Sequence, residues 1–122
     1  LIHQTWAYET WSERIKVHGF ETYDEMLSHI RSNYEKAAEL IQADGIVPSG
    51  EAFQCVLQSG VRNLHRDTFH ASYGIGRYLL ALVWYTHITG NDILHAMNFD
   101  RNNIVDKVSF SMTMTSSICP AA

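Results

Sequence analysis

The clearest hydrophobic pattern in the chain has helical spacing and lies between residues 22 and 45. Thr22-Tyr-Asp-Glu25 has the residue types of a capping box, in which the threonine hydroxyl accepts a backbone amide and the glutamate reaches back. After it, apolar residues recur three and four positions apart, namely Met26, Leu27, Ile30, Tyr34, Ala37, Ala38 and Ile41. Gln42-Ala-Asp-Gly45 ends this predicted helix, with Gly45 suited to a left-handed position.

Two short apolar segments have the patterns of strands. The opening, Leu1-Ile-His-Gln-Thr-Trp-Ala-Tyr8, alternates and predicts a strand that runs into a loop. Ile46-Val47-Pro48 predicts a buried strand, with Pro48 at its end where no ladder donor is needed. The order strand, helix, strand predicts an α/β fold with a parallel pair and a right-handed crossover. Because two or three strands do not make a full α/β domain, we expect a further N-terminal portion.

Two more helices are expected, with a polar loop between them. The first covers about 52–63, and the second runs from Ser72 or Tyr73 to Ile88. The second is apolar almost all round, so we expect other elements to cover it on both sides. Gly74 and Gly76 are expected to let it approach the sheet closely.

Composition and charge exclude several classes of protein. The 122 residues suffice for one domain, and 46% hydrophobic with 18% charged residues indicates a globular core. A net charge of −4, with no run of basic residues, argues against a nucleic-acid or anionic-membrane surface. No apolar stretch is long enough to cross a bilayer. Residues 92–122 form a tail whose pattern fits a strand or a poorly ordered end. A disulfide between Cys55 and Cys119 is possible, but no cysteine spacing supports it.

Candidate chemistry is concentrated in His65-Arg-Asp-Thr-Phe-His-Ala-Ser72, just before the last helix. A carboxylate that holds one imidazole nitrogen fixes the tautomer of a histidine and stabilises the imidazolium that it forms as a general base. The offset of three residues between Asp67 and His70 can bring such a pair together. Two alternatives remain open: Asp67 caps a turn while His70 fills a gap, or the two join His65 as zinc ligands.

Other residues near this stretch have simpler interpretations. We expect His65 at the rim of a cleft or on the surface, and Ser72 as the cap of the last helix rather than a nucleophile. Arg77 is expected to pair with a carboxylate or with helix-end carbonyls. Trp6 either covers the rim of the core or lines a substrate cleft.

The segment D-T-F-H-A-S-Y-G-I-G-R-Y-L-L-A-L resembles the last conserved block of the SGNH (GDSL-type) hydrolases, in a branch of unknown function. The residues that match the block are Asp67, His70, Ser72, Gly76, Arg77, Tyr78 and Leu79. I-V-P-S-G-E-A and Q-T-W-A-Y are similar to earlier strand ends, so the resemblance covers roughly residues 1–90. It implies a flavodoxin-like three-layer α/β/α fold and an esterase in which His70 is the base and Asp67 its partner.

The resemblance also implies what this chain lacks. The family's nucleophilic serine, oxyanion glycine and G-x-N-D asparagine all precede the D-x-x-H block, and the T-G-N-D at 89–92 follows it, so we treat that match as coincidental. The chain therefore resembles the C-terminal half of a hydrolase of small or carbohydrate-linked esters that needs no metal or cofactor. Relatives of this branch are often exported, which implies an exported protein. The alternative is a non-catalytic α/β binding module that keeps the fold.

Overall fold

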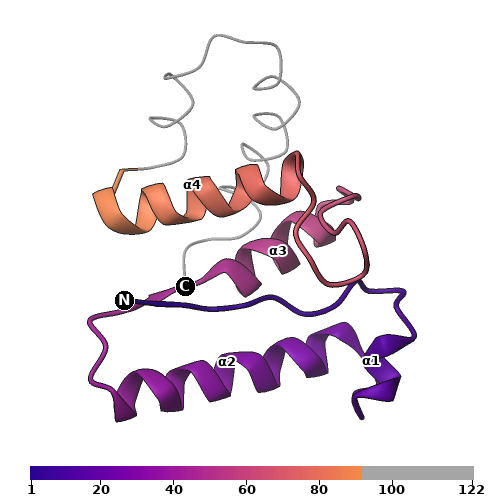
Figure 1. Ribbon diagram of the computed structural model, residues 1–122, viewed down its shortest axis with the longest axis horizontal. Helices are drawn as coiled ribbons and strands as arrows, with labels where there is room; N and C mark the ends of the chain where they lie inside the picture. The colour runs from indigo at the N-terminus through magenta and orange to yellow at the C-terminus, as the bar shows by residue number, and fades with distance from the viewer. Residues whose placement is uncertain (92–122) are drawn as a thin grey trace, which may run out of the picture.

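The computed structural model describes residues 1–91, which form a mixed α/β fold (Figure 1). In chain order the elements are β1 (Ile2–His3), α1 (Arg14–Val17), α2 (Tyr23–Leu40), β2 (Ile46–Val47), α3 (Ser49–Gln58) and α4 (Ile75–Thr89). The α/β class predicted from the sequence is therefore confirmed. The strand pattern predicted for the tail lies outside the described residues.

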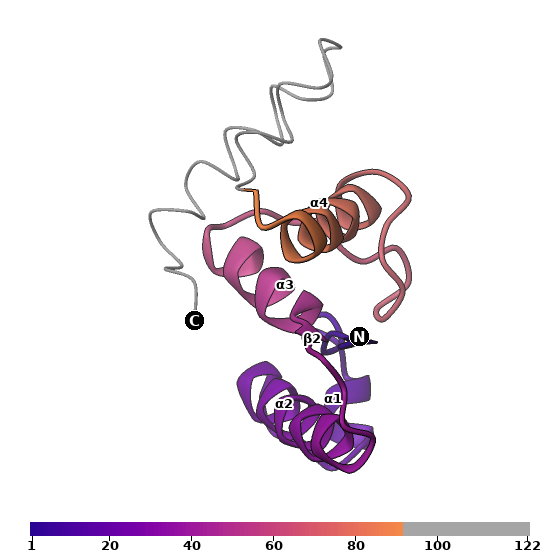
Figure 2. The same ribbon diagram turned by 90° about the vertical axis from the view of Figure 1, so that its left-hand side faces the viewer.

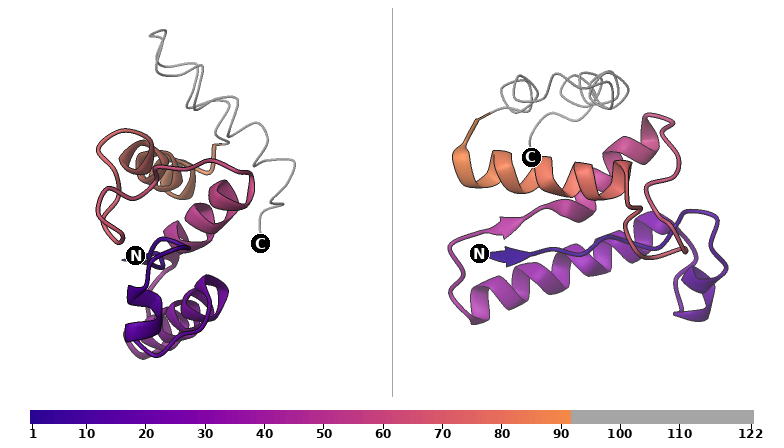
Figure 3. Two further views of the ribbon diagram at one scale, coloured as in Figure 1. Left: turned by 90° about the vertical axis from the view of Figure 1, so that its right-hand side faces the viewer. Right: turned by 45° about the horizontal axis from the view of Figure 1, so that its top comes forward.

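The two strands form a small parallel sheet, as the sequence predicted. Ile2 lies opposite Ile46, and the Ile2 amide donates to the Gly45 carbonyl at 3.0 Å. Figure 3 shows both strands pointing the same way. In Figure 2, α2 lies on one side of the strand pair and α4 on the other, and both helices contact β2. Two strands are too few to establish a three-layer sheet, so that arrangement stays a prediction.

Helix α2 begins at the predicted cap, but a different residue from the predicted one takes the left-handed conformation at its end. The Thr22 hydroxyl accepts the Glu25 amide at 3.1 Å, as in a capping box. After the last turn the left-handed residue is Gln42, at φ 52°, and not Gly45. The Ala43 amide then reaches the Ala38 carbonyl at 2.8 Å, which closes the Schellman turn.

Helix α3 begins at Ser49, three residues earlier than predicted, because its first turn packs tightly against β1 and α2. A Cβ at Gly50 would lie 2.7 Å from the Thr5 carbonyl and 2.8 Å from a methyl of Leu27, so only glycine fits. The Gln4 side chain accepts the Gly50 amide at 2.9 Å. The helix ends at Gln58 rather than near 63, since Gly60 takes a φ of +93°.

The core joins these elements around Phe53, Leu27, Leu64 and Val47, which are fully buried. Helix α4 contributes Leu79, Leu82 and Val83 but leaves Ile88 63% exposed. Within residues 1–91 it is thus covered on one side, not on both as predicted. None of the described helices is long and apolar enough to span a membrane. Cys55 is buried on α3, and Cys119 lies outside the described residues.

Candidate functional site

The loop between α3 and α4 lies at the carboxyl ends of β1 and β2 (Figures 1 and 3). Its two arms are closed by an antiparallel bridge between His65 and Ala71. The Arg66 amide donates to the His70 carbonyl at 3.0 Å, and the Ser72 amide donates to the Leu64 carbonyl at 2.7 Å. Ligand sites of parallel α/β sheets gather at this end of the strands.

The tip of the loop brings Asp67 and His70 together. His70 Nδ1 lies 2.8 Å from Asp67 Oδ2, and the His70 amide donates to Asp67 Oδ1 at 2.9 Å. The hydrogen bond from the His70 side chain, and to a smaller extent that from its backbone amide, lowers the pKa of Asp67 to about 2. The carboxylate is therefore ionised at neutral pH. With Nδ1 donating to Asp67, Nε2 is the ring atom left to take a proton. Both side chains are about half exposed, so another molecule can reach them.

Thr68 holds an unusual backbone conformation between these two residues. Its φ is +78°, which is rare for a β-branched residue and disfavoured by steric contact. The Thr68 carbonyl accepts the Glu9 amide at 2.7 Å, which ties the strained peptide to the segment after β1. Such conformations persist where the surrounding structure holds them, and they occur often at active sites. Nothing in the residue pattern of the sequence pointed to this strain.

Trp6 connects the loop to the hydrophobic core. Its indole N–H donates to the Phe69 carbonyl at 2.8 Å, and its ring stacks on Phe53 with centroids 4.7 Å apart and planes 13° apart. The same residue therefore packs on the core and fixes the backbone next to His70. The predicted contact of Trp6 with substrate stays a prediction.

His65 is buried, at 6% exposure, and not at the rim where we expected it. Its Nε2 lies 3.0 Å from the Ala7 carbonyl, and the ring sits edge-on to Phe53. Burial lowers the pKa of His65, which favours the neutral ring. His65 does not join Asp67 and His70 as a ligand, and residues 1–91 contain no group of three His, Cys, Asp or Glu side chains able to hold a metal ion.

A second histidine–serine pair lies nearby and was missed by the sequence analysis. His3 Nε2 is 2.7 Å from Ser49 Oγ, and the His3 ring packs edge-on to Trp84 at 5.1 Å. Burial lowers the pKa of His3. Because Ser49 is fully buried, it cannot meet a substrate where it stands, and the pair joins the ends of the two strands. The two predicted parallel strands end at His3 and just before Ser49, and this placement was the signal that could have revealed the pair.

The start of α4 packs against the base of the loop. Ser72 Oγ accepts the Gly76 amide of the first turn at 2.9 Å, but the N-cap residue of α4 is Gly74 and not Ser72 as predicted. A Cβ at Gly76 would lie 2.3 Å from the Leu64 carbonyl oxygen, whereas Gly74 has nothing within 4 Å. Gly76 thus permits close approach of the helix to the loop, not to the sheet, and Gly74 has no such role.

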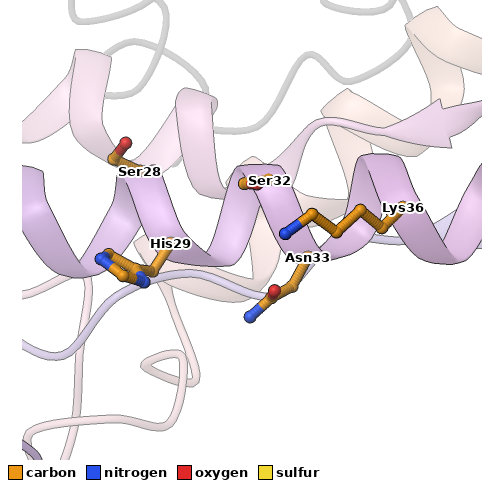
Figure 4. Close-up of a pocket in the computed structure, with 5 residues that line it drawn as sticks. All are labelled: Ser28, His29, Ser32, Asn33 and Lys36. Atoms are coloured by element: carbon orange, nitrogen blue, oxygen red, sulfur yellow. The ribbon is translucent and has the colours of Figure 1, made fainter.

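A shallow hollow on α2 is separate from this loop. It is lined by polar side chains of one helix face, namely Ser28, His29, Ser32, Asn33 and Lys36 (Figure 4). None of the candidate catalytic residues lines it. The loop remains the candidate site.

The comparisons with known proteins assign the chain to a family but do not give it an activity. Residues 1–115 match the family model described as a domain of unknown function, DUF4886. The crystal structure of a DUF4886 family protein from Bacteroides uniformis ATCC 8492 is similar, with a TM-score of 0.74 and 28% identity over 97% of this chain and 47% of that protein. This chain therefore spans about half the length of that relative. No curated protein matches the chain.

Proposed function

Since this chain belongs to the DUF4886 family, whose function is not established, we propose its activity from its own site: it supplies the base and the orienting carboxylate of an SGNH-type ester hydrolase. The observation that carries the proposal is the 2.8 Å contact between His70 Nδ1 and Asp67 Oδ2 at the carboxyl ends of two parallel strands. A carboxylate held on one imidazole nitrogen makes the other nitrogen an effective base.

The proposed reaction proceeds through an acylated serine that lies outside this chain. His70 Nε2 takes the proton of the serine hydroxyl while the serine oxygen attacks the ester carbonyl. The imidazolium that forms is stabilised by the ionised Asp67, and it returns the proton to the departing alkoxide. A water molecule then attacks the acyl group in the same way and frees the serine.

The proposed fold is the flavodoxin-like three-layer α/β/α arrangement of that superfamily. It is supported by α2 and α4, which contact β2 from opposite sides (Figure 2). Along a parallel strand, the backbone N–H and C=O groups of successive residues point in turn toward the strand on one side and the strand on the other. The amides of Ile2 and Gln4 both donate to carbonyls of β2 or of the residue before it. His3 therefore directs its backbone groups toward the other edge, where a further strand would extend the sheet.

The proposed substrate is a small or carbohydrate-linked ester, and neither a metal nor a cofactor takes part in the proposed reaction. The rival proposal is a binding module that keeps the α/β fold without catalysis. The two proposals differ in whether an activated serine stands beside His70 in the longest natural protein that contains this chain. That difference can be measured directly.

A fluorophosphonate probe tests the hydrolase, because it labels a serine that a neighbouring base activates. The longest natural protein is treated with the probe, and the labelled peptide is located by mass spectrometry. We expect one labelled serine outside residues 1–122, lost in His70→Ala and retained in His29→Ala, which removes an exposed histidine of α2. A folded protein that takes no label, or a label that survives His70→Ala, would favour the binding module.

A further inference from the structure

We propose that Arg66, Tyr73 and Arg77 bind a negatively charged group of the substrate, so that the ester cleaved at His70 carries an oxyanion. This inference rests on the hydrolase function proposed above. It narrows the class of substrate, because neither the resemblance nor the comparisons give the ester a charge.

The three side chains form one exposed cluster at the start of α4. The guanidinium carbon of Arg66 lies 4.7 Å from the centre of the Tyr73 ring, and that of Arg77 lies 4.5 Å from it. Arg66 also donates from Nη1 to the Tyr73 hydroxyl. Tyr73 is 69% exposed, and both arginines are exposed as well. Two cations therefore share one ring at the surface.

The cluster adjoins the proposed catalytic pair. Arg66 Nε lies 3.7 Å from Asp67 Oδ2, the oxygen that also contacts His70 Nδ1. An anion held by Arg66 would consequently lie close to the ring of His70. The loop supplies Arg66 and, in the turn just before α4, Tyr73, whereas Arg77 lies in the first turn of α4, so the cluster depends on how the loop folds back on the helix.

The positive charge of the cluster is only partly neutralised. Asp67 is its one carboxylate contact in the described residues, and that carboxylate is already engaged by His70. The Arg77 side chain makes no hydrogen bond or ion pair with residues 1–91, contrary to the carboxylate or carbonyl partner predicted for it, and the first turn of α4 contains no acidic residue. Stacking of an exposed cation on a ring contributes only about 0.5–1 kcal/mol. The Arg77 guanidinium and the Nη2 group of Arg66 thus remain available to a ligand.

The chemistry of these donors selects an oxyanion. A guanidinium group presents a planar set of N–H donors that matches a carboxylate, sulfate or phosphate, with two parallel hydrogen bonds. The proposed substrate is an ester with such a group near the scissile bond, for example the half-ester of a dicarboxylic acid or an ester of an acidic sugar.

A pair of matched esters tests this specificity in the longest natural protein. 4-Nitrophenyl butyrate is neutral, and the 4-nitrophenyl half-ester of succinic acid carries a carboxylate at similar length. We expect Arg66→Gln with Arg77→Gln to lower kcat/KM for the half-ester about tenfold or more, chiefly through KM, because charge-assisted hydrogen bonds are lost. The neutral ester has no charge for the arginines to hold, so its kcat/KM should fall by a much smaller factor and the preference for the half-ester should drop about tenfold. Lys36→Gln, which removes a charge on α2, should alter neither rate. An equal loss for both esters would mean that the arginines only brace the loop, and no loss for either would also overturn the proposal.

A binding experiment separates this inference from the hydrolase itself. The protein is labelled with ¹⁵N-arginine and titrated with sodium sulfate, with sodium chloride at equal ionic strength as the control. We expect saturable shifts of the Arg66 and Arg77 Nε–H signals with sulfate alone. Sulfate shifts without His70-dependent hydrolysis would refute the hydrolase and keep the anion site. Hydrolysis without sulfate shifts or half-ester preference would refute the anion site alone.

Discussion

Replacing Gly76 with alanine should displace the loop that carries Asp67 and His70. Gly76 lies in the first turn of α4, and a Cβ there would lie 2.3 Å from the carbonyl oxygen of Leu64. That oxygen belongs to the backbone, so it cannot rotate away. It also accepts the Ser72 amide at 2.7 Å, and this hydrogen bond closes the base of the loop. One methyl group therefore acts on the backbone next to the candidate site.

The size of the effect follows from the contact. Carbon and oxygen atoms that are not bonded approach to about 3.3 Å, so the loop or the helix must move by about 1 Å. Overpacking of this kind costs about 1–3 kcal/mol, and a weakened hydrogen bond about 1 kcal/mol more. The better helix propensity of alanine offsets about 1 kcal/mol. We expect Gly76→Ala to lower the free energy of unfolding by about 1–3 kcal/mol.

Urea unfolding of Gly76→Ala and Gly74→Ala, followed by circular dichroism, measures this difference. Gly74 is the matched control, because it lies two residues away with nothing within 4 Å. It should change stability by no more than about 0.5 kcal/mol. The fluorophosphonate labelling rate should also fall by about a hundredfold in Gly76→Ala, since a shift of about 1 Å misplaces His70. If Gly76→Ala is as stable as Gly74→Ala and labels at the same rate, the argument from close packing is wrong.

Three further predictions concern single residues of the site. Trp6→Phe keeps a ring but leaves the Phe69 carbonyl without its donor, so the free energy of unfolding measured in urea should fall by about 1–2 kcal/mol. An unchanged urea midpoint would contradict the role of Trp6 as an anchor of the loop. Asp67→Asn cannot stabilise the imidazolium, so fluorophosphonate labelling should slow by at least about a hundredfold, and wild-type labelling would exclude the dyad. Burial lowers the pKa of His65 below 6.5, so the unfolded chain takes up the proton first and stability should fall as pH drops below about 6.5. His65→Gln should reduce this slope between pH 8 and 5 in urea titrations, and His3, whose pKa is also lowered by burial, should contribute in the same direction. An unaltered slope in His65→Gln would mean that His65 does not titrate in this range.

The elements that the sequence predicted well are those fixed by neighbouring residues. The capping box at Thr22 and the spacing of apolar residues set the start and the course of α2, because helix formation depends on contacts three and four positions apart. The contact between Asp67 and His70 is local for the same reason, since its residues are three apart. The sequence thus located the candidate site, and the catalytic role of these residues stays a prediction.

Only the tertiary structure decided which side chains surround that pair. The Trp6 indole reaches a carbonyl 63 residues away, and His65 reaches one 58 residues away, so no local pattern could show either contact. The position of α4 decides that Gly76 meets the loop and that Arg66 and Arg77 share the ring of Tyr73. Burial, pKa and charge balance at a site depend on segments that meet only after folding. For this reason the sequence by itself determined where the candidate residues Asp67 and His70 lie, and the packing of the loop between β1 and α4 determined which side chains surround them.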